Sequence, residues 1–262
     1  MVNDPPKDQM IGPVGVDSAE AVGAPAVAQA IHVPFIPSAE QVFSPSILLK
    51  MPAGRLFCMT THALLPRVRS LANETAQGPV LERRSLVLAC IVQSCAWIEG
   101  FANDVYEGCV QGADDPTWLP KVTERRLVLR VGLAWEHGAT PRGISGSQKW
   151  EKLLKQLGLK LPKPSACPEV EAMIALVSLR NAFVHAEPML HPTTNDAHQE
   201  LEALLQGRFA IDNGNGFLWP NVLSIGCAEW AVATARAFAL HVAGMLGMPD
   251  PFQLVLERFE LV

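Results

Sequence analysis

Residues 81–108, LERRSLVLACIVQSCAWIEGFANDVYEG, form a long and largely apolar stretch without proline. Apolar residues occupy nearly every face of a helix here, which is typical of a central helix that its neighbours cover on all sides. Glu99 and Asn103 are the exceptions, and because they are four residues apart they point the same way. A carboxylate in such surroundings needs a partner, and Arg180 is one candidate. This stretch therefore predicts an all-α fold built around one buried helix.

The other periodic segments also predict helices, with breaks at Pro and Gly. Residues 56–59 suggest a short strand, after which Thr61 can cap a helix that ends near Gly78. Residues 209–219 read as a hairpin. Further helices are expected over residues 116–137, a short segment from a capping box at 145–148 to Gly158, and residues 168–184, 195–206 and 221–247. The most economical architecture for these helices is an antiparallel up-and-down bundle.

The chain divides into four parts by composition. Residues 1–45 are rich in Pro and Ala and predict a flexible or extended arm, and residues 46–78 predict a connecting segment with a helix. Residues 79–248 form the helical bundle, which carries a small helix-plus-hairpin insertion before its last long helix. Residues 249–262 remain as a C-terminal tail.

Composition limits the possible functions. With 262 residues, of which 49% are hydrophobic, the chain has enough apolar surface for a core. Its formal net charge of −5 argues against a protein that coats nucleic acid over its whole surface, so any RNA binding must be local. The six cysteines include no Cys-x-x-Cys pair and are expected to be reduced and buried.

Residues 1–6 carry neither the basic nor the apolar part of a secretory signal, so we expect a cytoplasmic location. The apolar stretch 223–248 contains Glu229, Arg236 and His241, which would be costly in lipid. We therefore expect a core helix there and no membrane contact.

Residues 180–185, Arg-Asn-Ala-Phe-Val-His, place a fixed cation, an amide and an imidazole at the end of an apolar helix. A guanidinium can hold phosphate oxygens through two parallel hydrogen bonds, and histidine moves protons near neutral pH. This combination indicates chemistry on a phosphodiester. The structural alternatives are an ion pair of Arg180 with Glu99, or a charge that complements the helix dipole, and a C-capping role for His185.

The pattern Arg-Asn-x-x-x-His, with Trp97–Asn103 upstream, resembles the HEPN superfamily over roughly residues 80–248. Members with this motif are often metal-independent ribonucleases, whereas others have lost catalysis and serve as binding or dimerisation modules. The resemblance implies cleavage of RNA by its own 2′-hydroxyl, leaving a 2′,3′-cyclic phosphate. Arg180 would stabilise charge on the pentacoordinate phosphate, His185 would transfer a proton, and Asn181 would orient one of the two.

Two protomers are expected to build this site. Residues five apart on a helix point about 140° away from each other, so Arg180 and His185 do not share a face, whereas Asn181 and His185 do. A productive site then needs groups from a second copy of the helix. The HEPN resemblance implies the same arrangement, a homodimer with a shared cleft.

Residues outside the motif have supporting roles in this hypothesis. Glu99 and Asn103 are expected to pack against and orient the catalytic groups. A set of basic residues could bind the phosphates of RNA, namely Lys149, Lys152, Lys155, Arg125 and Arg126. The simpler explanation of these residues is a helix face exposed to solvent. No cofactor is expected. No metal is expected either, because Cys167 and the histidines at 185, 191 and 198 match no compact site.

Two functions follow from the sequence. The first is a HEPN-type endoribonuclease acting in defence or as a toxin, held by an antitoxin or another regulatory protein. The second is a catalytically silent HEPN scaffold that dimerises and binds a nucleotide, RNA or a protein partner.

Overall fold

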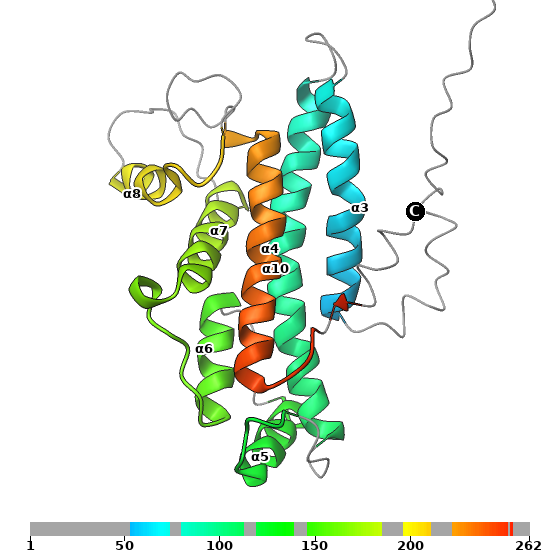
Figure 1. Ribbon diagram of the computed structural model, residues 1–262, viewed down its shortest axis with the longest axis vertical. Coiled ribbons are helices and arrows are strands. Elements are labelled where there is room, and N and C mark those ends of the chain that lie inside the picture. The colour runs from blue at the N-terminus through cyan, green and yellow to red at the C-terminus, as the bar shows by residue number, and fades with distance from the viewer. Residues whose placement is uncertain are drawn as a thin grey trace, which may run out of the picture. The chain divides into compact units, whose positions relative to one another are not determined.

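The computed structural model describes residues 53–73, 80–112, 119–138, 146–184, 196–210, 222–250 and 252–253, all within one compact unit that spans Phe43–Val262. The regular structure in these ranges is entirely helical, which confirms the predicted all-α class (Figure 1). The elements are α3 (Ala53–Asn73), α4 (Val80–Gln111), α5 (Arg125–Glu136), α6 (Gly146–Gln156), the 3-10 helix η1 (Pro164–Ala166), α7 (Pro168–Val184), α8 (Asp196–Leu205) and α10 (Ile225–Leu246).

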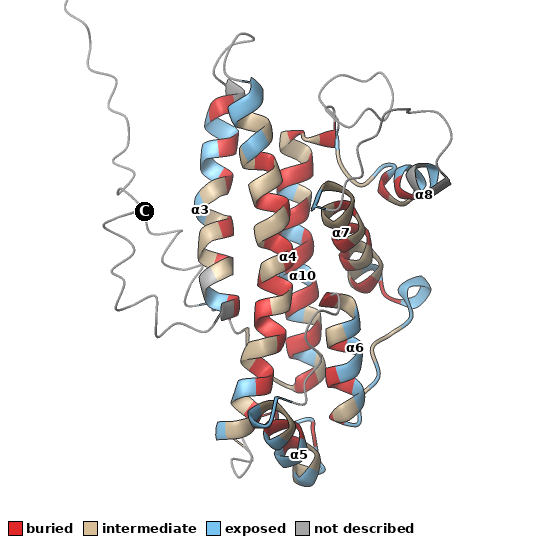
Figure 2. Ribbon diagram, turned by 180° about the vertical axis from the view of Figure 1, so that it is seen from behind, coloured by how far each residue is buried: buried red, intermediate tan, exposed pale blue. Residues whose placement is uncertain are grey.

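Helix α4 is the centre of the bundle, as its sequence predicts. It contacts α3, α5, α6, α7 and α10. Between Leu86 and Val110 every residue except Glu107 is buried or half-buried, and the buried residues include Trp97, Phe101 and Tyr106 (Figure 2). By length and composition, α4 is also the one described helix that could cross a membrane, and more than half of its most apolar window is buried inside the protein.

The long helices alternate in direction along the chain. Hydrogen bonds join Gly54 near the start of α3 to Asp104 near the end of α4, and Arg67 near the end of α3 to Glu82 near the start of α4. These two helices are therefore antiparallel. Helices α4 and α10 run side by side in the same direction, and α7 runs against them (Figure 1).

Large aromatic side chains fill the space between the helices. Trp150 of α6 packs against Phe101 and Phe238, with ring centroids 5.2 and 6.0 Å apart. Phe252 packs edge-on against Trp97 and Phe101, at 5.1 Å in each case. Phe252 comes from the segment expected as a tail, so at least this residue belongs to the core.

The start of α3 differs from the prediction. Residues 56–59, expected as a strand, lie inside the helix, which begins at Ala53. The hydroxyl of Thr61 donates to the carbonyl of Phe57 at 2.6 Å, so Thr61 bonds back into the preceding turn and does not cap a helix. The helix lies in the segment 46–78 that was expected to connect the arm to the bundle, and it packs along α4.

The start of α5 also differs. A helix was expected from Pro116, but residues 119–124 are non-helical and α5 begins at Arg125. The buried Leu119 has a φ of 52°, a left-handed conformation that interrupts any helical run. At Gly132, an added Cβ would lie 2.7 Å from the carbonyl oxygen of Cys109. Glycine at this position therefore allows α5 to cross the end of α4 in close contact.

The other helices agree closely with the sequence. Helix α7 spans the predicted residues 168–184, and α6, α8 and α10 lie within one to four residues of their expected bounds. Ser224 caps α10, since its hydroxyl oxygen accepts the N–H of Cys227 at 3.1 Å. The arm expected over residues 1–45 and residues 211–219 of the expected hairpin lie outside the described residues.

Candidate functional site

Arg180 and Asn181 lie in the last turn of α7. The Nη1 atom of Arg180 donates a hydrogen bond to Oδ1 of Asn181 at 2.9 Å, and both residues are half-buried. The amide therefore orients the guanidinium next to it. His185, the third predicted catalytic residue, directly follows the last residue of α7 and lies outside the described residues.

The Arg180 side chain is close to α4. Burial raises the pKa of the Cys95 thiol to about 12, while the charge of Arg180 lowers it and that of Glu99 raises it further. The Nε atom of Arg180 is buried and has no hydrogen-bond partner among the described residues. Arg180 also forms no ion pair with any carboxylate of the described ranges. Its positive charge is thus held in place without being neutralised there.

Glu99 and Asn103 have a different neighbour from the one considered in the sequence. Lys149 of α6 donates to Oδ1 of Asn103 at 2.7 Å. Burial lowers the pKa of Lys149, and the charge of Glu99 acts in the opposite direction. Gly146, at the start of α6, allows the close approach, since a Cβ there would lie 3.0 Å from Cγ of Glu99. Glu99 and Asn103 both lie beside the start of α6, and the hydrogen bond from Lys149 to Asn103 joins α4 to α6.

The predicted RNA-binding residues separate into two groups. Lys152 and Lys155 line a cavity of about 530 Å³ between α5 and α6, together with Arg130, Gln148, Glu151 and Gln156. Arg126 and Arg130 line an adjoining cavity of about 440 Å³ with Leu127. We call the four cations Arg126, Arg130, Lys152 and Lys155 the basic groove.

The remaining two predicted cations lie elsewhere. Lys149 binds Asn103, as described above, and Arg125 donates to the carbonyl of Gly112 at 2.8 Å. Within the basic groove, Arg126 donates to the exposed Glu124 through Nε and Nη2 at 3.0 and 2.8 Å, and Glu151 also lines the larger cavity, so carboxylates offset part of the positive charge.

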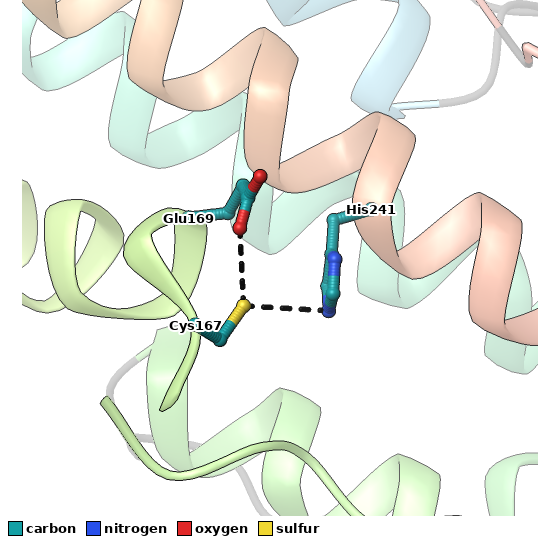
Figure 3. Close-up of side chains that lie close together, drawn as sticks. All are labelled: Cys167, Glu169 and His241. Atoms are coloured by element: carbon teal, nitrogen blue, oxygen red, sulfur yellow. Dashed lines mark hydrogen bonds between the residues drawn. The ribbon is translucent and has the colours of Figure 1, made fainter. Parts of the chain in front are cut away.

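The structure also brings together a cluster that the sequence did not predict. Cys167 precedes α7, Glu169 lies in the first turn of α7 and His241 lies near the end of α10 (Figure 3). The sequence contains one signal for this cluster, because Cys167 and Glu169 flank Pro168 at the start of a predicted helix. Its pairing with His241, which is 74 residues away, depends on the packing of α7 against α10.

The six cysteines are free and buried, as predicted. Burial is the largest cause of a raised pKa at Cys58, Cys90, Cys95 and Cys227. These four thiols therefore remain protonated at neutral pH and act as small apolar groups.

Comparisons with known proteins give no independent identification of this chain. No family model, no curated protein and no solved structure matches it.

Proposed function

We propose that this chain is a HEPN-type, metal-independent endoribonuclease that cleaves RNA through attack of the 2′-hydroxyl on the adjacent phosphate. The proposal rests mainly on the hydrogen bonding and burial of the Arg180 side chain. Its guanidinium is oriented by Asn181 and has a buried Nε without a partner in the described residues. A fixed, half-buried cation that forms no ion pair within the described residues is suited to an anionic ligand such as a phosphate.

Each residue of the motif has a role in the proposed reaction. As the 2′-hydroxyl attacks, a fifth oxygen ligand forms on phosphorus and negative charge increases on the non-bridging oxygens. Arg180 stabilises that charge without first having to reorganise. His185, whose ordinary pKa is about 6.5, takes the proton of the 2′-hydroxyl or returns one to the leaving 5′-oxygen. Asn181 holds the guanidinium in position.

A homodimer is part of the proposal. On an ideal helix, residues five apart point about 140° away from each other, so one copy of the motif would not present the residues at 180 and 185 on the same face. Two copies of α7 placed against each other would allow Arg180 of one protomer and His185 of its partner to contact the same phosphate.

The basic groove supports an RNA ligand. Leu176, one helical turn before Arg180, contacts Cys95 of α4, whereas α5 crosses α4 at Cys109. These two points on α4 are fourteen residues, or roughly 21 Å, apart. An RNA strand that contacts both the motif and the groove would have to span at least this distance along the bundle.

Reversing charge in the basic groove should weaken RNA binding without a change in sequence preference. For Lys152→Glu with Lys155→Glu, we expect the dependence of log Kd on log salt to become shallower by about 0.7 for each phosphate that the groove no longer neutralises. Filter binding at several salt concentrations measures this slope. Lys160→Glu, at an exposed position outside the groove, is the matched control. Equal slopes in all three proteins would exclude the groove from the RNA path.

The enzymatic proposal is tested with a mixed-sequence RNA and the full chain in excess EDTA. Fragments with 2′,3′-cyclic phosphate and 5′-hydroxyl ends are expected, because the reaction uses no metal. A DNA of the same sequence should remain intact, since it lacks the attacking hydroxyl. Circular dichroism in the same buffer verifies that the helices persist. Intact RNA with a folded protein, or DNA cleavage at a comparable rate, would contradict the mechanism.

A catalytically silent HEPN scaffold is the second candidate, and an apolar surface on α5 favours it. Leu129 and Leu133 are four residues apart and are 49% and 46% exposed. Such a pair is suited to contact with another protein, either a second copy or a regulatory partner such as an antitoxin. Under this alternative the chain dimerises and binds a ligand, but the RNA in the assay above stays intact. In both cases we propose a cytoplasmic protein, with a defence or toxin role for the ribonuclease.

A further inference from the structure

Three potential metal ligands converge where the start of α7 meets the end of α10. The thiol of Cys167 lies 3.2 Å from Oε2 of Glu169 and 3.6 Å from Nε2 of His241 (Figure 3). One ligand atom from each of the three residues lies within 4.8 Å of the other two. Figure 3 shows the three side chains pointing toward one another, Glu169 from α7, Cys167 from the residue just before it and His241 from α10.

The local backbone fixes two of these ligands. Cys167 ends η1, where its N–H donates to the carbonyl of Pro164 at 3.2 Å, and its own carbonyl accepts the N–H of Glu171 at 3.1 Å. Pro168, the first residue of α7, restricts the chain between these two contacts. Cys167 is thus a rigid junction between two helical segments, and Glu169 follows it in the first turn.

We propose that Cys167, Glu169 and His241 bind one zinc ion, with a fourth position open to water. Thiolate, carboxylate and imidazole are the three side-chain ligands that zinc uses, and together they balance its charge. Zinc–sulfur bonds of about 2.3 Å and zinc–nitrogen or zinc–oxygen bonds of about 2.0–2.1 Å place tetrahedral ligand atoms about 3.3–3.6 Å apart. The two separations from the Cys167 sulfur, 3.2 and 3.6 Å, are close to this geometry, and the Glu169 and His241 ligand atoms, which lie within 4.8 Å of each other, would move closer together around the ion.

The arrangement fits a metal better than a nucleophilic thiol. In a reactive cysteine–histidine pair, the carboxylate contacts the imidazole and stabilises its positive charge. Here the Cys167 thiol donates to the carboxylate of Glu169, which disfavours the thiolate. A divalent cation bound between the three groups stabilises both the Cys167 thiolate and the Glu169 carboxylate, and it displaces the proton of the thiol.

The burial of the three ligands would protect the bound ion and still leave one side of the site open to solvent. Cys167 is 5% exposed, whereas Glu169 and His241 are partly exposed, so the fourth position can face solvent. The site does not depend on the ribonuclease proposal. Arg180 lies eleven residues after Glu169 on α7, or roughly 17 Å along the helix, and has no part in it.

Metal binding to the full chain tests the zinc site directly. After dialysis against a chelator, we expect one equivalent of Co²⁺ to produce a sulfur-to-cobalt charge-transfer band and the intense visible bands of tetrahedral cobalt. One equivalent of Zn²⁺ should abolish both. Absence of the charge-transfer band, or no zinc bound above the buffer background, would overturn the assignment.

Variants assign the ligands. His241→Ala and Glu169→Gln, both at partly exposed positions, should each weaken zinc binding by more than about 100-fold, since even outer-shell changes cost 10–100-fold. The exposed His137→Ala and Glu151→Gln serve as matched controls and should bind zinc like the unchanged protein. Cys167→Ser should remove the charge-transfer band. Unchanged zinc affinity in His241→Ala, with its helix content retained, would exclude the proposed site.

Discussion

Under the ribonuclease proposal, replacing Arg180 with alanine is expected to lower the rate of RNA cleavage by at least about 100-fold, the loss typical of removing one preorganised group that stabilises transition-state charge. The side chain is only half-buried and forms no described ion pair, so the variant should keep its helix content. Arg180→Lys keeps the charge but loses the two-pronged geometry, and it should recover only part of the rate. Cleavage is measured by the release of fragments with cyclic phosphate ends.

His185→Ala should cause a loss of similar size, because no other group of the motif can transfer a proton near neutral pH. The matched controls are Arg55→Ala in the first turn of α3 and His137→Ala after α5, both at exposed positions. These controls should cleave RNA at the unchanged rate. Full activity in either Arg180→Ala or His185→Ala would remove the catalytic assignment. A size measurement on each variant separates loss of chemistry from loss of the proposed dimer.

Trp150→Ala should be among the most destabilising single changes, with a loss of about 3–5 kcal/mol in the free energy of unfolding. Its indole is fully buried against Phe101 and Phe238, and its Nε1 donates to the carbonyl of Ile98 at 3.0 Å. Truncation would leave a cavity where α4, α6 and α10 meet. Urea unfolding followed by circular dichroism measures the change.

Two further variants show how much of this loss of stability depends on the aromatic packing around Trp150. Trp150→Phe keeps most of the aromatic volume and should cost less than the alanine variant. Trp135→Ala removes a partly exposed ring that stacks on Tyr106 at a centroid distance of 5.1 Å, and it should cost less than half as much as Trp150→Ala. An equal loss for Trp135→Ala would show that the aromatic cluster around Trp150 is not the principal support of the core.

Local chemistry explains why some helices were predictable. Pro168 is favourable at the first position of a helix and unfavourable inside one, and the apolar run that follows has no other break, so the bounds of α7 follow from its own residues. The central position of α4 follows equally directly. A helix that is apolar on every face has to be covered on every face.

Other features depend on contacts that no local pattern contains. Thr61 has the residue type of an N-cap, but α3 already begins at Ala53 and packs along α4, so the Thr61 hydroxyl lies inside the helix and bonds the carbonyl of Phe57. The late start of α5 depends on Leu119, which is buried in a left-handed conformation that leucine rarely adopts. In both cases tertiary packing outweighs local preference.

The candidate site was likewise predictable only where its residues are neighbours in the sequence. The position of Arg180 beside Asn181 follows from adjacency on one helix, whereas the contact of Lys149 with Asn103 depends on how α6 docks onto α4. The proximity of His241 to Cys167 likewise requires knowing which helices are neighbours. The sequence indicates which groups can do chemistry, and the packing decides which of them meet.

The buried thiols can be used to follow local unfolding of the protein. Five of the six cysteines are no more than 2% exposed, and Cys167 is 5% exposed. An alkylating reagent reaches such sulfur atoms only when a helix detaches, so the order in which they are labelled follows the order in which segments of the bundle come apart. Cys58 on α3, Cys90, Cys95 and Cys109 along α4, and Cys227 on α10 thereby mark three helices without any introduced probe.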